Sequence, residues 1–250
     1  MKKINIAFIQ ARMESKRFPG KNLKEICNYP MLDWVIFGVS RSRILDGFGL
    51  VIPETKESSI IKEKYLSKCY VYTGHHYNVL DRYYNALLNY EKKFNCRIDN
   101  VVRITADCPL LAYHSSIIDE VLTYHNFNNC DFTHNRCVDG YPSGIDVEVM
   151  TREILIQSWE NVNLTKCKYS DKKINEYKEH VTLYAKENLI NKLVFGNVTA
   201  GLGGFKLKWS IDDIESFERV EDLMKFLIFR FGNKIELEKA NERRLINERI

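Results

Sequence analysis

Short apolar runs alternate with amphipathic stretches through the first half of the chain. The apolar runs are brief and rich in β-branched residues, which predicts buried strands at 4–10, 49–52, 69–73 and 101–105. In the stretches between them, apolar residues recur at helical spacing, which predicts helices over 31–43, 56–66, 79–94 and 115–124. Strands that alternate with helices are typical of βαβ units. We therefore expect an α/β fold, with a mostly parallel central sheet and helices on both faces.

The pattern changes in the second half of the chain. Strand-like runs at 131–134 and 144–150 flank a turn rich in Gly and Pro, and the long polar stretch 163–178 predicts an exposed loop. Beyond it, the pattern predicts strands at 192–198 and 205–211, then helices over 214–231 and 236–250. We expect residues 1–250 to form a single domain, with an arm that protrudes from within about 132–200.

Composition and charge exclude several classes of protein. The chain is 45% hydrophobic and 28% charged, which is ordinary for a globular protein, and its net charge of +4 is too small to indicate nucleic-acid binding. It has no apolar run of the roughly 20 residues that a membrane helix needs, and its N-terminus lacks a signal-peptide pattern. The seven cysteines are odd in number and contain no C-x-x-C pair, which argues against a disulfide framework. We expect a cytoplasmic protein that binds neither nucleic acid nor membrane.

A basic loop follows the first predicted strand. It carries four cations and one acid, namely Arg12, Lys16, Arg17 and Lys21 with Glu14. Ligands of open α/β sheets bind at the carboxyl ends of the strands, where such cations would hold a polyphosphate. The Pro-Gly pair at 19–20 would turn Lys21 back toward the strand end. The loop lacks the Walker A pattern, so it is either a different polyphosphate site or a solvated basic loop.

Acidic residues follow two other predicted strands. Asp107 comes after the strand at 101–105, and Asp212 and Asp213 come after the strand at 205–211. A carboxylate beside a polyphosphate usually serves Mg²⁺, which binds one or two carboxylates together with phosphate oxygens. The alternative for each is a helix N-cap, since a turn and a helix follow. Cys108 has no identifiable base beside it and is interpreted as a packing residue.

Six segments in a fixed order also match a set of motifs: A-R-x-x-S-x-R-x-P-G-K at 11–21, V-L-D-R-Y-Y at 79–84, R-I-T-x-D-C-P-L at 103–110, G-x-D-x-E-V at 144–149, E-H-V-T at 179–182, and W-x-x-D-x-x-x-D/S-F-E at 209–218. Together they resemble the motifs of cytidylyltransferases of the SpsF-like type, relatives of the synthetases that make CMP-linked acid sugars. The resemblance covers most of the chain.

This resemblance implies a Rossmann-like nucleotidyltransferase fold with a small β/loop dimerisation arm. The implied enzyme transfers CMP from CTP to an acceptor oxygen and releases pyrophosphate, with Mg²⁺ as cofactor, in the synthesis of surface polysaccharide precursors. The acceptor is either an acidic sugar or a phosphorylated or phosphonate compound. The implied partners are CTP, this small acidic acceptor and a second copy of the chain in a homodimer. The preference for cytosine comes entirely from the resemblance.

The resemblance also implies roles for single residues. The implied nucleotide-binding residues are Ala11, Arg12, Ser15, Arg17, Lys21, Asp81, Arg82, Thr105 and Asp107. The implied metal ligands are Asp107 and Asp212. The implied catalytic residues are Arg12, Lys21, Asp107 and Asp212. The implied acceptor-binding residues are Asp146, Glu148, Glu179 and His180.

Two departures from the motifs keep alternatives open. Glu14 stands where the family usually has Gly, and its charge either weakens phosphate binding or points outward. Asp213 follows Asp212 in place of the common Thr, and it either shares the metal or caps the helix. His180 is either a general base or structural. The pair His75 and His76 either lines the nucleotide site or lies at the surface.

Two other classes of protein also compete with the cytidylyltransferase. A glycosyltransferase that uses a nucleotide-sugar would be expected to hold its metal at Asp-x-Asp, and the chain has only the late pair at 212–213. A non-catalytic nucleotide-binding protein is the other class, which Glu14 makes plausible. Only a transferase releases pyrophosphate from CTP, so this product separates the classes.

Overall fold

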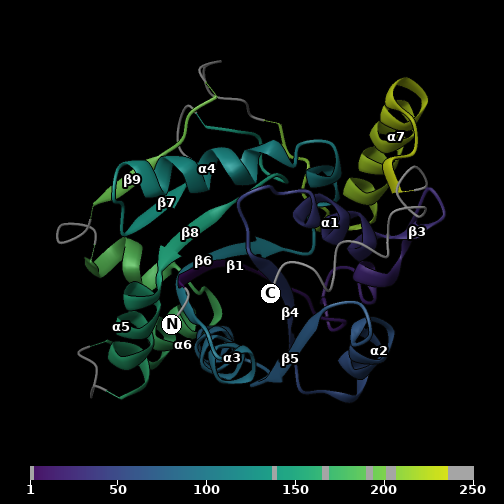
Figure 1. Ribbon diagram of the computed structural model, residues 1–250. Helices are drawn as coiled ribbons and strands as arrows, with labels where there is room; N and C mark the ends of the chain where they lie inside the picture. The colour runs from purple at the N-terminus through teal and green to yellow at the C-terminus, as the bar shows by residue number, and fades with distance from the viewer. Residues whose placement is uncertain (1–2, 137–139, 165–168, 190–193, 201–206, 236–250) are drawn as a thin grey trace.

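A seven-stranded sheet forms the centre of the protein in a computed structural model that describes residues 3–136, 140–164, 169–189, 194–200 and 207–235 (Figure 1). The strand order is β5-β4-β1-β6-β8-β7-β9. The strands are β1 (Lys3–Gln10), β4 (Gly47–Pro53), β5 (Tyr70–Gly74), β6 (Arg97–Thr105), β7 (Phe132–His134), β8 (Glu148–Thr151) and β9 (Phe195–Asn197). Of these described strands, β8 alone runs against the others. The expected mostly parallel sheet is confirmed. A separate two-stranded sheet pairs β2 (Glu25–Ile26) with β3 (Tyr29–Pro30).

Helices cover both faces of the sheet, as expected. The helices are α1 (Met31–Ser40), α2 (Lys56–Tyr65), α3 (Val79–Phe94), α4 (Ser116–Phe127), α5 (Arg152–Asn163), α6 (Asp171–Glu179) and α7 (Ile214–Phe231), with short turns η1 (Lys21–Leu23), η2 (Pro109–Ala112) and η3 (Ala185–Leu189). One hydrophobic core contains side chains of α1, α2, α4 and α7, and the other contains side chains of α3, α5 and α6. Every described helix is too short or too polar to span a lipid bilayer.

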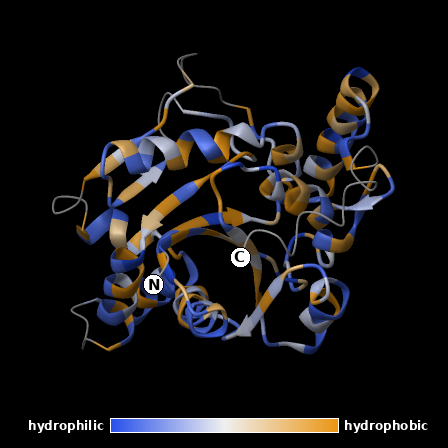
Figure 2. Ribbon diagram, viewed as in Figure 1, coloured by the Kyte–Doolittle hydropathy of each residue, from blue (hydrophilic) through white to orange (hydrophobic). Residues whose placement is uncertain are grey.

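The central strand β1 shows why the chain folds this way. Ile6, Ala7, Phe8 and Ile9 are all fully buried. Ala7 and Ile9 pack into one core while Ile6 and Phe8 pack into the other, so a continuous apolar run suits a strand that is covered on both faces. Burial of each Ile or Phe side chain contributes roughly 1.5–3 kcal/mol. Figure 2 shows these hydrophobic strands between helices whose surfaces mix hydrophobic and hydrophilic residues. The apolar run ends at Gln10, where the basic loop begins.

The second half of the chain corrects the sequence-based prediction of an exposed loop at 163–178. Much of that stretch is helix α6, which begins with Ser170 accepting a hydrogen bond from the Lys173 backbone N–H and buries Tyr177 against the rest of the protein. The prediction failed because this helix buries a single aromatic side chain among charged residues. Helix α5 was also missed. Strands β7, β8 and β9 join the central sheet, and α5 and α6 pack against α3.

Other predictions for the second half have mixed outcomes. The predicted helix over 214–231 is confirmed as α7. The described part of the predicted strand at 205–211 makes only an isolated bridge between Lys208 and Ser143. Residues 192–193 and 205–206 and the predicted helix over 236–250 lie outside the described residues. A dimerisation role for an arm within 132–200 stays a prediction.

Candidate active site

The basic loop folds back over the end of β1. The Gly20 backbone N–H donates to the Met13 carbonyl at 2.9 Å, and Gly20 has a φ of 73°, which is the left-handed region that favours glycine. The buried side chain of Asn22 donates to the Arg12 carbonyl at 2.8 Å and holds the loop closed. The predicted turn at 19–20 is confirmed, because Lys21 points back toward the strand ends.

Lys21 reaches the end of β6. Its Nζ lies 3.4 Å from Asp107 Oδ2 and 2.5 Å from the Ile211 carbonyl oxygen. Burial alone would raise the pKa of Asp107, but the charge of Lys21 and a hydrogen bond from Thr105 outweigh it and hold the pKa below its usual value. Asp107 is therefore an ionised carboxylate. The N-cap residue of the following turn η2 is Cys108 and not Asp107, so the N-cap alternative for Asp107 is wrong.

Asp212 faces the same loop from the start of α7. Its carboxylate lies 2.7 Å from Arg17 Nη2 and 2.5 Å from Lys208 Nζ. Asp213 instead caps α7: its side chain accepts from the Ser216 backbone N–H at 2.9 Å, while the Ser216 hydroxyl bonds back to the Asp213 backbone. Asp213 is therefore the cap of α7, and the carboxylate of Asp212 faces the basic loop.

A close backbone approach places Asp212 beside Asp107. A Cβ on Gly144 would lie 2.3 Å from the carbonyl carbon of Trp209, so only glycine fits there. The Trp209 backbone N–H donates to the Ser143 carbonyl at 2.5 Å, and the Ile211 backbone N–H donates to the Asp107 carbonyl at 3.0 Å. These contacts explain the glycine of the G-x-D-x-E-V segment and bring the two carboxylates to one end of the sheet.

A cavity of about 1080 Å³, here called the loop pocket, lies at the carboxyl ends of β1 and β6. Its lining includes these residues with predicted roles: Arg12, Ser15, Arg17, Lys21, Thr105, Asp107, Glu179 and Asp212. His75 and His76 also line it, so of the two alternatives for this pair the structure favours the pocket. The lining cations Arg12 and Lys16 form no ion pair with any residue that the structure describes.

Three residues with predicted nucleotide-binding roles lie outside this lining. Ala11 is buried in the core, and its backbone N–H donates to the Val51 carbonyl at 3.4 Å. Asp81 accepts from the Trp159 ring N–H at 2.8 Å and so joins α3 to α5. In the structure, Ala11 therefore packs in the core, and Asp81 connects α3 to α5.

Arg82 is different from Ala11 and Asp81 because it carries an uncompensated charge. The side chain is 1% exposed, and its Nε and Nη1 have no hydrogen-bond partner among the described residues. Burial, assisted by the nearby charge of Arg12 and opposed by Tyr83 and Glu14, lowers the pKa of Arg82 to about 10. A buried guanidinium this close to a lining residue adds positive potential to the loop pocket.

Glu14 is turned onto helix α2. Its carboxylate accepts hydrogen bonds from the hydroxyls of Thr55 and Ser58, at the first turn of that helix. Burial alone would raise the pKa of Glu14, but these hydrogen bonds outweigh it and lower the pKa. The carboxylate is thus anchored to α2 and fixes the basic loop there, although the residue still borders the loop pocket.

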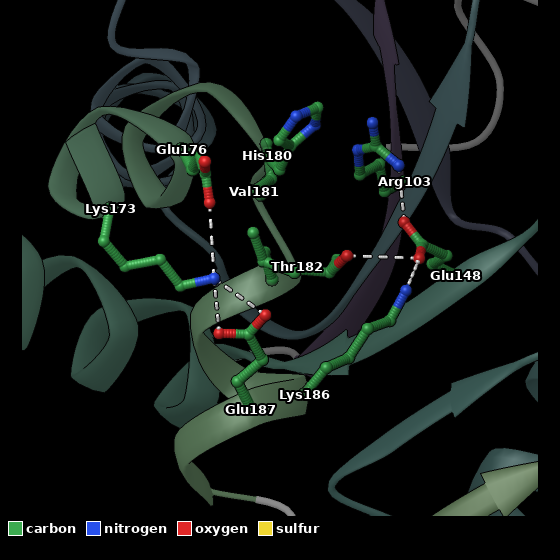
Figure 3. A pocket seen from close by; sticks show the side chains of 10 residues that line it. Arg103, Glu148, Lys173, Glu176, His180, Val181, Thr182, Lys186 and Glu187 are labelled. Carbon is green, nitrogen blue, oxygen red and sulfur yellow. Dashed lines mark hydrogen bonds and ion pairs between the residues drawn. The ribbon is translucent and has the colours of Figure 1, made fainter.

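A second cavity of about 600 Å³, here called the ion-pair pocket, lies beside β6 and β8 and is bordered by α6 and η3 (Figure 3). Glu148 accepts from Arg103 Nη1 at 2.5 Å, from the Thr182 hydroxyl at 3.1 Å, and from Lys186 Nζ. Burial alone would raise the pKa of Glu148, but the charges of Arg103 and Lys186 lower it to about 2. A row of polar residues crosses the sheet here from β6 through β8 and β7 to β9. Its members are paired in register: Arg103, Glu148, His134 and Asn197.

The structure divides the predicted acceptor-binding residues between these places. Glu148 and His180 line the ion-pair pocket, whereas Glu179 lines the loop pocket. Asp146 lines neither: its Oδ2 accepts from the Gly144 backbone N–H at 3.1 Å, and burial raises its pKa. Sequence reasoning missed several residues that the pockets bring together: Asn22, Lys173, Glu176, Lys186 and Glu187. The residues of α6 were missed because the sequence predicted an exposed loop at 163–178, although it correctly identified this stretch as polar.

Two further groups bear on chemistry at this edge of the sheet. Cys108 is fully buried, and burial raises the pKa of its thiol well above the usual value, so it remains a packing residue. Within the described residues, no three His, Cys, Asp or Glu side chains converge on a metal position. The carboxylates of Asp107 and Asp212 border a cavity that cations also line, and this arrangement fits Mg²⁺, which takes few protein ligands and completes its shell with phosphate oxygens and water.

Comparisons with known proteins agree with this geometry. The family model described as cytidylyltransferase matches residues 6–241. The chain is 31% identical to an uncharacterized protein of Methanocaldococcus jannaschii, over 88% of this chain and 83% of that one. It is 26% identical to the spore coat polysaccharide biosynthesis protein SpsF of Bacillus subtilis, over 86% and 84% of the two chains. A solved cytidylyltransferase of Leptospira borgpetersenii superposes with a TM-score of 0.75 at 25% identity, covering 98% of both chains. The chain therefore belongs to the cytidylyltransferase family, and it is an enzyme with the nucleotidyltransferase fold.

Proposed function

We propose that the protein transfers CMP from CTP to a small acidic acceptor, either an acidic sugar or a phosphorylated or phosphonate compound, and releases pyrophosphate. The observation that carries the proposal is the loop pocket, where Arg12 and Lys16 lie without ion-pair partners among the described residues beside the carboxylates of Asp107 and Asp212. Unpaired cations suit a triphosphate, and adjacent carboxylates suit its metal. The similarity to SpsF supports a role in the synthesis of surface polysaccharide precursors.

The chemistry requires positioning and charge neutralisation rather than covalent help from the protein. An acceptor oxygen forms a bond to the α-phosphorus of CTP, and the bond from that phosphorus to the bridging oxygen breaks. Pyrophosphate leaves with the electron pair, and a hydroxyl acceptor loses its proton to solvent. Arg12, Lys16 and Arg17 neutralise the charge that builds up on the β- and γ-phosphates, while Lys21 stands at the strand ends beside the α-phosphate.

Asp107 and Asp212 would hold the Mg²⁺ of this reaction. Both carboxylates contact cations of the loop, Asp107 at Lys21 and Asp212 at Arg17, so the residues that would hold the metal and the cations that would hold the phosphates lie at one end of the sheet. Bound there, Mg²⁺ would neutralise charge on the phosphate oxygens. Removal of divalent ions with EDTA is expected to stop turnover, and addition of Mg²⁺ to restore it.

Pyrophosphate release from the purified protein tests the proposal. Each of the four nucleoside triphosphates is incubated with Mg²⁺ and with pools of acid sugars or of phosphorylated and phosphonate acceptors. Release with CTP alone, dependent on one pool, is the expected result. Release with a different triphosphate would overturn the base assignment, and binding of CTP without release from any pool would favour a non-catalytic nucleotide-binding protein.

We also propose that the enzyme acts as a homodimer in the cytoplasm, with residues from within about 132–200 at the contact. Light scattering of the purified chain is expected to give twice the monomer mass of 29.4 kDa. A monomer at micromolar concentration would contradict the dimer.

A further inference from the structure

The ion-pair pocket separates its charges into two ends. Its sheet end holds two cations, Arg103 and Lys186, against one carboxylate, Glu148, for a net charge of +1. Its helix end holds one cation, Lys173, against two carboxylates, Glu176 and Glu187, for a net charge of −1. Figure 3 shows the two groups on opposite sides of the pocket. The pocket is therefore neutral as a whole, with His180 counted as neutral, but strongly dipolar.

The sheet end faces the loop pocket. Arg103 lines the ion-pair pocket, and its Nη2 donates to the side chain of Gln10 at 3.3 Å, which in turn lines the loop pocket. A group bound at this end lies nearest the triphosphate. This inference rests on the proposed function, which allows two classes of acceptor. In a phosphorylated or phosphonate acceptor the attacking oxygen belongs to the anionic group, and in an acidic sugar it belongs to a hydroxyl beside the carboxylate. The anionic group of the acceptor is thus expected at the sheet end, where Arg103 and Lys186 attract it.

The helix end requires a different chemical group. Lys173 Nζ lies 2.8 Å from Glu187 and 3.3 Å from Glu176, and the Tyr177 hydroxyl donates to Glu187 at 2.9 Å. The side chains of Glu176 and Glu187 are 40% and 41% exposed, so acceptor lone pairs remain open toward the cavity. A second negative group would be repelled there, while an ammonium group would complete the charge balance.

We propose that the acceptor of this enzyme is a zwitterion. Its anionic group binds Arg103 and Lys186 beside the triphosphate, and its ammonium group binds Glu176 and Glu187 at the far end of the pocket. A volume of about 600 Å³ accommodates a small molecule of this kind.

Two matched pairs of probes test this assignment by calorimetry on the full chain saturated with a non-hydrolysable CTP analogue. The pairs are phosphoethanolamine with ethyl phosphate, and glucosamine 6-phosphate with glucose 6-phosphate. The amino member of at least one pair is expected to bind about tenfold more tightly than its amino-free partner. In the double variant E176Q/E187Q, which leaves Lys173 without a carboxylate, the preference is expected to reverse. The matched control Glu63→Gln, an exposed residue of α2, is expected to keep the wild-type preference.

Failure of this inference and failure of the proposed function give different results. Titration with the CTP analogue comes first and concerns the proposed function alone, so absence of nucleotide binding overturns that function. With nucleotide bound, the absence of any preference for amino probes, including no binding of any probe, overturns the zwitterion. An unchanged preference in the double variant overturns the assignment to Glu176 and Glu187.

Discussion

The two pockets adjoin on one sheet, yet only the loop pocket holds cations without ion-pair partners among the described residues. In the loop pocket, Arg12 and Lys16 have no ion-pair partner among the described residues, and the buried Arg82 close to Arg12 forms no ion pair with them either. In the ion-pair pocket, Arg103 and Lys186 both contact Glu148. Unpaired cations repel one another and attract a polyanion, whereas paired cations lose their charge balance, and the fold loses stability, when the shared carboxylate is removed. The contrast therefore predicts that substitution of the unpaired cations in the first pocket changes binding, and that substitution of Glu148 in the second changes stability.

The largest effect is expected for Asp107→Asn. The substitution keeps the shape of the side chain but removes the charge that would hold Mg²⁺ beside the triphosphate. We expect turnover to fall by on the order of 1,000-fold or more, a loss of about 4 kcal/mol of transition-state stabilisation, with the fold intact. Pyrophosphate release and circular dichroism measure the two properties. The exposed Asp222→Asn is the matched control, and an Asp107→Asn enzyme with normal activity and Mg²⁺ dependence would refute the metal assignment.

The next largest effect is expected for Glu148→Gln, as a loss of stability. The substitution leaves the largely buried Arg103 and the half-buried Lys186 without their carboxylate, which costs about 3 kcal/mol of the free energy of unfolding. Urea denaturation measures this loss. The matched control is Glu153→Gln, whose ion pair with Arg97 is exposed and should change stability by about 1 kcal/mol or less. Equal effects of the two substitutions would remove the contrast between the pockets.

The same carboxylate predicts a pH dependence of stability. In the folded protein the pKa of Glu148 is about 2, which is below the ordinary value of 4.5, so the unfolded chain binds its proton first as pH falls. The stabilisation is therefore complete above about pH 5 and is lost between about pH 4.5 and pH 2, a difference of roughly 3 kcal/mol. Urea denaturation across this range should show the loss in wild type and a smaller loss in Glu148→Gln. Parallel curves for the two proteins would contradict the assignment.

A smaller effect, on binding alone, is expected for Arg12→Gln. Because Arg12 has no ion-pair partner among the described residues, its removal should leave the melting temperature nearly unchanged. The affinity for CTP should fall about tenfold, or about 1.4 kcal/mol, through the lost contact with phosphate. Calorimetry and thermal denaturation measure the two effects, with the exposed Arg43→Gln as control. A large drop in melting temperature with unchanged CTP affinity would reverse the contrast between the pockets.

The smallest effect is expected for Glu14. Since its carboxylate is anchored on Thr55 and Ser58, Glu14→Gln should change the affinity for CTP by less than about threefold and reduce stability by about 1 kcal/mol or less. A gain of tenfold or more in CTP affinity would show instead that this charge opposes the triphosphate.

The sequence predicts the loop pocket better than the ion-pair pocket, for a physical reason. The loop from Arg12 to Lys21 is contiguous, and Asp107 and Asp212 each follow a segment that leads to the same edge of the sheet. The proximity of the loop and Asp107 follows from the rule that parallel strands end together, whereas the segment before Asp212 reaches this edge through an isolated bridge. The ion-pair pocket instead combines Arg103 and Glu148 with Lys173 and Lys186, which come from four separate segments. Only the register of β6 on β8 and the packing of α6 bring them together, and neither is visible in the residue pattern.

Local chemistry explains most of the remaining differences between prediction and structure. The pattern places α3 and α7 correctly because each has a strong apolar stripe, and it misses α6, whose apolar side is narrow. The resemblance assigns Ala11, Asp81 and Arg82 to the nucleotide together, but Ala11 packs in the core and Asp81 holds Trp159. A motif residue can thus support a site through packing, and only the folded structure separates such residues from those that line the pocket.

The most direct test of the account is a comparison of CTP with cytidine, titrated into the wild-type chain by calorimetry at increasing salt. The account predicts that CTP binds at least about 30-fold more tightly than cytidine at low salt, and that this advantage shrinks as salt screens the loop cations. It would be contradicted if the two bind with equal affinity, or if the advantage of CTP is independent of salt and unaffected by Arg12→Gln.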